Sequence, residues 1–116
     1  MPDLPAPSLD GRRFAPAAEV PGGDVGADTV FEYVEEDGLI HARYGGGAVR
    51  LGFLVGTREG DVLRFRYAQV RADGTTASGR CESEIEVLAD GRLRLHEAWA
   101  WESRDGAGTS IVEEVI

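Results

Sequence analysis

The sequence predicts an all-β domain, an antiparallel up-and-down meander of about eight strands. Five Asp-Gly pairs divide the chain, beginning at positions 10, 37, 73, 90 and 105, and alternating apolar and polar residues lie between them. Asp-Gly between such runs is a strong hairpin signal, because a two-residue type I′ turn needs positive φ at both positions. No run of helical length has apolar residues spaced i, i+3, i+4 and i+7 without a glycine break, so we expect no helix longer than about two turns.

Eight strand-length segments follow from these breaks. The first, 11–18, contains Pro16, which confines it to an edge or an end of the sheet because proline lacks the N–H donor. A loop follows over 20–28, and the other seven segments are 29–35, 39–44, 48–58, 62–71, 76–88, 92–103 and 109–116. Residues 1–10 contain three prolines and are expected to form an extended or disordered tail, which leaves 11–116 as a single domain.

A small sheet with this many strands must close on itself or leave aggregation-prone edges, so we expect a small calycin-like barrel. The interior of an eight-stranded barrel is either filled by side chains or holds one small ligand. The alternative architectures are a flattened two-sheet meander sandwich and a β-roll.

Period-two alternation assigns the two faces of three strands clearly. On 62–71, one face carries Leu63, Phe65, Tyr67 and Gln69. On 76–88, it carries Ala77, Gly79, Cys81, Ser83, Ile85 and Val87. On 92–103, it carries Leu93, Leu95, Glu97, Trp99 and Trp101. We expect these three faces to point into the barrel and the intervening arginines and glutamates to face solvent.

The composition excludes several classes of function. A net charge of −9 argues against nucleic acid and anionic membranes as partners, since both are bound by a basic face. All twelve cationic residues are arginine, so a pyridoxal Schiff base, a lysine general base and a P-loop lysine are excluded, and we expect no cofactor. With one cysteine, no run of about 20 apolar residues and no signal-peptide pattern, we expect a cytoplasmic protein, either a monomer or a homodimer.

Glu97 is the most informative single residue, because it is in phase with the apolar face of its strand. A buried carboxylate must be paired, solvated in a cavity, or protonated with a raised pKa. One interpretation is a polar anchor or general acid/base in an apolar pocket. The other is a glutamate paired with arginine, or one at the wet rim of the barrel.

Aromatic residues surround Glu97 in this interpretation. Trp99 and Trp101 offer broad apolar walls with one N–H donor each, although they also fill cores well against the small residues of 76–88. The buried phenols need hydrogen-bond partners, for which Glu97, Gln69 and Ser83 are candidates. The predicted ligand-binding residues are Tyr33, Tyr44, Phe65, Tyr67, Gln69, Glu97, Trp99, Trp101 and Glu113.

Glu113 and Glu114 are adjacent in the last strand, so one of them must face inward if the strand lies fully in the sheet. A carboxylate there, near Glu97, would form a pair able to divide acid and base roles, while a solvent-facing pair on a closing strand is the simpler interpretation. No His-x-His, Cys-x-x-Cys or His-Glu-x-x-His spacing occurs, so no metal site is expected. Cys81 is expected to be an inert core thiol.

The set of motifs Phe31 with Tyr33, Tyr44-Gly45-Gly46, Gly52, Tyr67, Gly79 with Cys81, Glu97-x-Trp99-x-Trp101, and Ser110 with Glu113 is distinctive. It resembles a family of small bacterial proteins, many of them labelled N-acetylglutamate synthase. The likeness runs from about Gly11 to Glu114, and it implies a shared β fold. It also draws attention to the residues that match the pattern, Tyr33, Tyr67, Glu97 and Glu113.

Three functions are compatible with these residues. The first is a non-enzymatic barrel that binds a small, mostly apolar or amphipathic molecule through an aromatic-lined interior and a carboxylate anchor. The second is a cofactor-free isomerase or cyclase, in which Glu97 and Tyr67 transfer a proton. The third is a structural module with a solid core.

Overall fold

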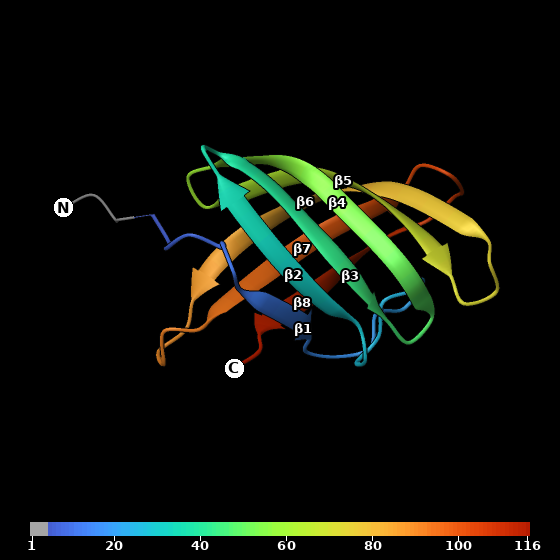
Figure 1. Cartoon of the computed structure of the whole chain (residues 1–116), viewed down its shortest axis with the longest axis horizontal. Coiled ribbons are helices and arrows are strands. Elements are labelled where there is room, and N and C mark those ends of the chain that lie inside the picture. The colour runs from blue at the N-terminus through green and yellow to red at the C-terminus, as the bar shows by residue number, and fades with distance from the viewer. Residues whose placement is uncertain (1–4) are drawn as a thin grey trace.

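The computed structural model describes residues 5–116, which form one closed antiparallel barrel in the strand order β1-β2-β3-β4-β5-β6-β7-β8, with β8 returning to β1 (Figure 1). The strands are β1 (Arg13–Pro16), β2 (Val30–Glu36), β3 (Leu39–Gly46), β4 (Val49–Glu59), β5 (Val62–Arg71), β6 (Thr76–Val87), β7 (Leu93–Trp101) and β8 (Ala107–Glu114). The predicted all-β barrel is therefore confirmed, and the sandwich and the roll are excluded. The described residues contain no helix long and apolar enough to cross a membrane.

The hairpin turns use their glycines in two ways. Asp37 and Gly38 both have positive φ, 52° and 78°, as the predicted two-residue turn requires, and the Arg58 N–H donates to the Gly38 carbonyl. At the four other Asp-Gly pairs only the glycine has positive φ. The turn positions are therefore right, but the predicted turn type holds at Asp37-Gly38 alone.

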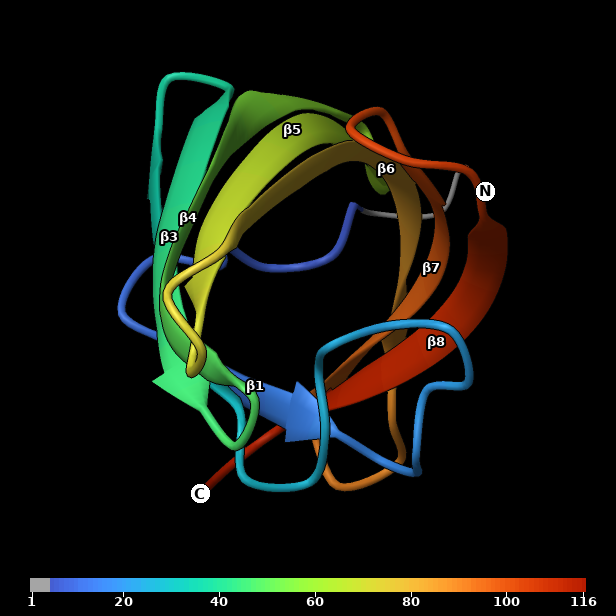
Figure 2. The ribbon, with the colours of Figure 1, turned by 90° about the vertical axis from the view of Figure 1, so that its right-hand side faces the viewer.

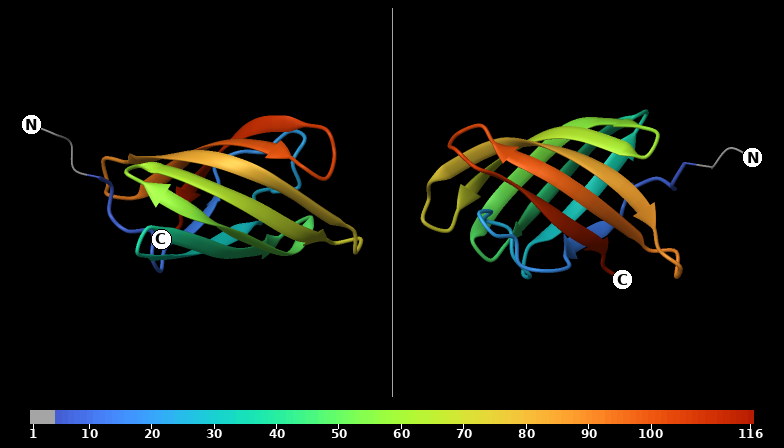
Figure 3. Two further views of the ribbon diagram at one scale, coloured as in Figure 1. Left: turned by 90° about the horizontal axis from the view of Figure 1, so that it is seen from above. Right: turned by 180° about the vertical axis from the view of Figure 1, so that it is seen from behind.

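The alternation of faces is confirmed on β5, β6 and β7. Leu63 and Phe65 are buried while Arg64 and Arg66 between them are exposed. On β6 the buried residues are Ala77, Gly79, Cys81, Ser83 and Ile85, but Val87 at the end of the strand is exposed. The strands tilt across the barrel, so that inward side chains from all eight fill a single core (Figure 3).

One end of the barrel is closed by the segment that precedes β1. Leu9 is fully buried, and the Arg58 side chain, itself only 8% exposed, donates to the carbonyls of Ala6 (2.6 Å) and Pro7 (3.0 Å) and to Glu35 Oε1 (2.8 Å). Residues 5–10 thus lack helix and strand but are packed against the barrel, because a buried guanidinium and two apolar side chains hold them. The expected tail is not loose here, and its first four residues lie outside the described part of the chain.

The opposite end is crossed by the β1–β2 connection, residues 17–29, which we call the roof loop. Figure 2 looks along the barrel from this side, and the light-blue roof loop crosses the lower right part of the opening, in front of β8. The indole N–H of Trp101 donates to the Gly22 carbonyl (3.1 Å), so the loop is attached to the rim of the barrel. The roof loop therefore covers the part of the opening next to β7 and β8.

Candidate ligand-binding site

A cavity of about 60 Å³ lies inside the barrel beneath the roof loop. It is large enough for ordered water or a very small ligand group, and small beside the roughly 300–1,000 Å³ of most ligand pockets. The barrel contributes an aromatic and polar lining: Phe31, Tyr44, Leu54, Phe65, Tyr67, Gln69, Cys81, Glu97, Trp99, Trp101 and Ser110. The roof loop contributes Val20, Gly23, Asp24 and Val25.

Glu97 is held by hydroxyl groups from the two strands that flank β7. Ser110 on β8 lies directly opposite it and donates to Oε1 (2.9 Å), while Ser83 on β6 approaches Oε2 (3.5 Å). Loss of hydration raises the pKa of the Glu97 carboxyl to about 7, because the two serine hydrogen bonds compensate only in part. Among residues 5–116 no arginine or histidine nitrogen lies within ion-pairing distance of this carboxyl.

Aromatic rings form the walls around this carboxyl. Trp99 and Trp101 meet edge to face with centroids 5.8 Å apart, and Tyr67 meets Trp101 in the same way at 5.7 Å. Phe31 stacks on Tyr44 with centroids 4.6 Å apart. Such contacts add roughly 0.5–1.5 kcal/mol per pair to the burial of the rings, so they stabilise the apolar walls.

Glycines on neighbouring strands make room for three of these rings. Tyr44 lies opposite Gly52, Tyr67 opposite Gly79, and Trp99 opposite Gly108. A Cβ at these glycines would lie 2.4–2.6 Å from the nearest ring or hydroxyl atom, well inside contact distance. The three aromatic side chains therefore pack directly against the backbone of these glycines.

Asp24 fastens the roof loop to the barrel. Its Oδ2 accepts from Gln69 Nε2 (2.8 Å) and from Arg71 Nε (2.6 Å), and its Oδ1 faces Arg104 at 3.6 Å. The Arg104 guanidinium also lies 4.5 Å from the centroid of the Trp101 ring. Gln69 in turn accepts from the Tyr44 hydroxyl (2.9 Å), so one polar chain joins the wall of the cavity to its roof.

Three buried donor groups have no hydrogen-bond partner within the described part of the chain: the indole N–H of Trp99, the hydroxyl of Tyr33 and one terminal guanidinium nitrogen (Nη2) of Arg71. Trp99 lines the cavity, whereas Tyr33 packs deeper, edge to face with Phe14, and is not among the lining residues. Buried polar groups are nearly always paired, so the Trp99 N–H next to a cavity points to an acceptor supplied from outside the chain.

A sequence model of the family described as "Avidin-like protein" matches residues 7–115 of the chain. The chain belongs to the avidin-like family. No curated protein and no solved structure matches it. The resemblance to proteins labelled N-acetylglutamate synthase accordingly stays a prediction, while the shared β-barrel fold is established.

This avidin-like barrel gathers most of the residues predicted from the sequence. Tyr44, Phe65, Tyr67, Gln69, Glu97, Trp99 and Trp101 all line the cavity. The Tyr67 hydroxyl donates weakly to the Ala100 carbonyl (3.4 Å) and makes no hydrogen bond to Glu97. Burial and the nearby Glu97 charge raise the pKa of Tyr33 and Tyr44, and burial followed by Cys81 and Glu97 raises that of Tyr67, so the three phenols stay neutral.

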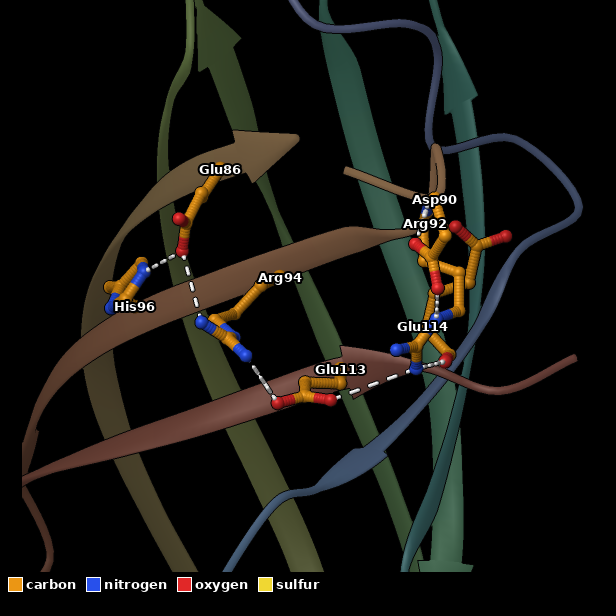
Figure 4. Close-up of polar contacts among 7 residues, drawn as sticks. All are labelled: Glu86, Asp90, Arg92, Arg94, His96, Glu113 and Glu114. Carbon is orange, nitrogen blue, oxygen red and sulfur yellow. Dashed lines mark hydrogen bonds and ion pairs between the residues drawn. The ribbon is translucent and has the colours of Figure 1, made fainter. Parts of the chain in front are cut away.

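Glu113, predicted as a ligand-binding residue, does not line the cavity of this avidin-like barrel. It lies opposite Arg94 on the outer face, where its Oε1 accepts from that guanidinium at 2.9 Å (Figure 4). Arg94 also contacts Glu86, which bonds His96 at 2.8 Å, and Arg92 joins from the other side. Ser110 lies opposite Glu97 and points inward, and alternation along β8 then places Val112 on the same inner face.

The sequence did not reveal the four lining residues of the roof loop or the role of Ser110 in the avidin-like site. No group of three or more His, Cys, Asp or Glu side chains suited to a metal ion occurs within residues 5–116. Cys81 is buried in the cavity wall, and burial together with the Glu97 charge raises the pKa of its thiol. It therefore stays protonated and poorly nucleophilic.

Proposed function

We propose that this avidin-like barrel binds one small molecule in its interior, with a polar group at Glu97 and an apolar body against Trp99 and Trp101. The observation that carries the proposal is the Glu97 carboxyl itself, which borders the cavity and is bonded only by two serine hydroxyls. Glu97 is half-buried and has no cationic partner within residues 5–116, which costs free energy that an apolar side chain of similar size would not cost. A ligand that bonds to Glu97 compensates this cost.

The indole N–H of Trp99, which has no partner in the described part of the chain, also supports this site. It needs a hydrogen-bond acceptor, whereas the Glu97 carboxylate needs a donor. A ligand that offers both a donor for Glu97 and an acceptor for Trp99 satisfies both groups at once. The small volume restricts the enclosed part of the ligand to a few heavy atoms, so a larger body must displace the roof loop. Proteins of the avidin-like family bind small ligands such as biotin, which is consistent with a small-molecule partner here.

The proposal is tested by titrating the protein with biotin and with a panel of small amphipathic alcohols, amides, amines and carboxylates. The chain has two tryptophans, so the two indole N–H signals in an NMR spectrum report directly on the cavity. A binding compound shifts the Trp99 signal and raises the melting temperature, and Glu97→Gln weakens both effects. The matched control is Glu84→Gln, which removes the same charge from an exposed position on β6.

Absence of any shift in either indole signal across the whole panel would show that the interior is a closed core, as a structural module requires. An unchanged affinity in Glu97→Gln would show that the ligand binds elsewhere. Both results contradict the proposed site.

A second function, proton transfer to or from a bound substrate, is favoured by one observation. The pKa of Glu97, raised to about 7, suits a group that exchanges a proton near neutral pH. Conversion of a bound compound, lost in Glu97→Gln while binding and folding remain, would distinguish an isomerase or cyclase from a binding protein. Tyr67 is the weaker partner in this scheme because its hydroxyl is directed to the Ala100 carbonyl.

A further inference from the structure

The cavity has an uneven distribution of charge. Its lining contains two carboxyl groups, Asp24 and Glu97, and no basic side chain. Asp24 is neutralised by Arg71 and Arg104 at the rim, whereas Glu97 has only the hydroxyls of Ser83 and Ser110. An ionised Glu97 thus leaves one uncompensated negative charge inside the barrel.

The titratable groups around Glu97 on the other strands of the barrel are not positive. Tyr33 on β2, Tyr44 on β3, Tyr67 on β5 and Cys81 on β6 all feel the Glu97 charge, and the pKa of each is raised. Asp24, in the roof, is paired with Arg71 and Arg104, so Glu97 is the one carboxyl of the cavity lining without a cationic partner among the described residues. Anions are therefore repelled from the deep part of the cavity, and a cation is the one charged species that this environment stabilises.

The walls fit a cation as well. Aromatic faces attract a positive charge through the ring quadrupole, most strongly when water is excluded, and tryptophan is the best of the three rings. The Ser110 hydroxyl oxygen lines the cavity beside the carboxylate and is able to accept a further hydrogen bond. An ammonium group has three donors and matches a carboxylate flanked by hydroxyl oxygens.

We propose that the polar group recognised at Glu97 is a protonated amine, so that the ligand is a small amphipathic organic cation. This inference rests on the proposed function and narrows it to one class of ligand. It also predicts that a carboxylate-bearing ligand binds, if at all, with its anion at the rim near Arg71 and Arg104, where the positive charges lie.

The test uses three probes with the same four-carbon chain, n-butylammonium, n-butanol and butyrate, titrated while the Trp99 and Trp101 indole N–H signals are followed. At pH 8 n-butylammonium is expected to bind at least tenfold more tightly than n-butanol, with butyrate weakest. Its affinity should fall about tenfold from pH 8 to pH 6. The reason is that the ionised fraction of a carboxyl with a pKa of about 7 is about ten times larger at pH 8 than at pH 6. Glu97→Gln should remove the advantage of n-butylammonium over n-butanol, and Glu84→Gln should retain it.

Stronger binding of n-butanol or butyrate than of n-butylammonium overturns the cation inference and leaves the proposed site standing. An equal preference for n-butylammonium over n-butanol in Glu97→Gln and in the wild type also overturns it, because a group other than Glu97 would then bind the ammonium. If none of the three probes shifts either indole signal while biotin or another panel compound does, the cation inference is wrong and the proposed binding function is retained. If no compound of either set does so, the proposed function falls with it.

Discussion

Trp99 lies directly opposite Gly108 in the pairing of β7 with β8, and a Cβ at that glycine would be 2.6 Å from Cζ2 of the indole. The ring therefore occupies the place of a side chain that the neighbouring strand does not have. Tyr67 over Gly79 and Tyr44 over Gly52 repeat the arrangement on other strands. The shape of the cavity thus depends on residues that contribute no side chain to it.

The substitution Gly108→Ala tests this dependence. The added methyl group forces the Trp99 indole to move, and overpacking of this kind costs about 1–3 kcal/mol of unfolding free energy. Urea unfolding measures the loss, and a shift of the Trp99 indole N–H signal shows the displacement. Gly26→Ala is the control, because a Cβ there has only a Glu19 oxygen at 4.0 Å nearby. Equal effects of the two substitutions would contradict the role given to Gly108.

The raised pKa of Glu97 makes the stability of the fold depend on pH. The folded protein keeps the Glu97 proton up to about pH 7, whereas the unfolded chain releases it near pH 4.5. This group therefore costs nothing below pH 4.5, lowers the unfolding free energy as the pH rises toward 7, and adds nothing further above pH 7. The cost at pH 8 is at most about 3 kcal/mol and is reduced by any water that reaches the cavity.

Unfolding of the wild type and Glu97→Gln at pH 5 and pH 8 measures this effect. The glutamine has no proton to lose, so the variant should gain stability relative to the wild type between the two pH values. No buried arginine loses a partner, because Glu97 has none in residues 5–116, and the variant should stay folded at both pH values. Parallel pH profiles of the two proteins would show that Glu97 titrates as an ordinary surface carboxyl.

The substitution Asp24→Asn should loosen the roof loop without opening the barrel. It removes a charge-assisted hydrogen bond to Arg71 and the attraction to Arg104, interactions worth roughly 1.5–3 kcal/mol for a bond to a charged group. We expect faster amide hydrogen exchange at Gly22, Gly23 and Val25, and faster association and dissociation of a bound ligand. Asp28→Asn, at an exposed position of the same loop, serves as the control. Unchanged exchange in the loop would remove Asp24 as its fastening point.

Adjacent residues of β5 give a direct test of strand orientation. Phe65→Ala removes a buried ring from the cavity wall and should cost about 3–5 kcal/mol. Arg64→Ala removes a side chain that is 57% exposed and paired only at the surface with Glu82 and Glu59, so its cost should stay within about 0.5 kcal/mol. The reverse order of the two losses would mean that β5 faces the other way.

The barrel and the faces of its central strands follow from local information. Alternation along a strand determines which side chains share a face, and this places Glu97 with Trp99 and Trp101 without knowledge of any other strand. The closure of the sheet follows from the number of strands and the need to cover edges. These are the parts of the structure that the sequence predicts correctly.

The roof of the site depends on contacts between distant parts of the chain, which alternation does not report. Asp24 meets partners 45 and 47 residues later in the sequence, both at the end of β5, which the fold brings under the loop. The loop itself has no periodic pattern that marks it as part of a site. Glu113 illustrates a second limit. Two adjacent glutamates do not indicate which of them faces inward until the register with Arg94 is known.

The shortest strand holds the ring of strands together. β1 pairs with β2 at two positions and with β8 at three, whereas β4 and β5 pair at ten. Two fully buried side chains anchor this narrow seam in the core, Phe14 within β1 and Leu9 in the segment that precedes it. Removal of the first 16 residues would therefore turn the closed barrel into a seven-stranded open sheet with the edges of β2 and β8 unpaired, ready to accept a strand from another molecule.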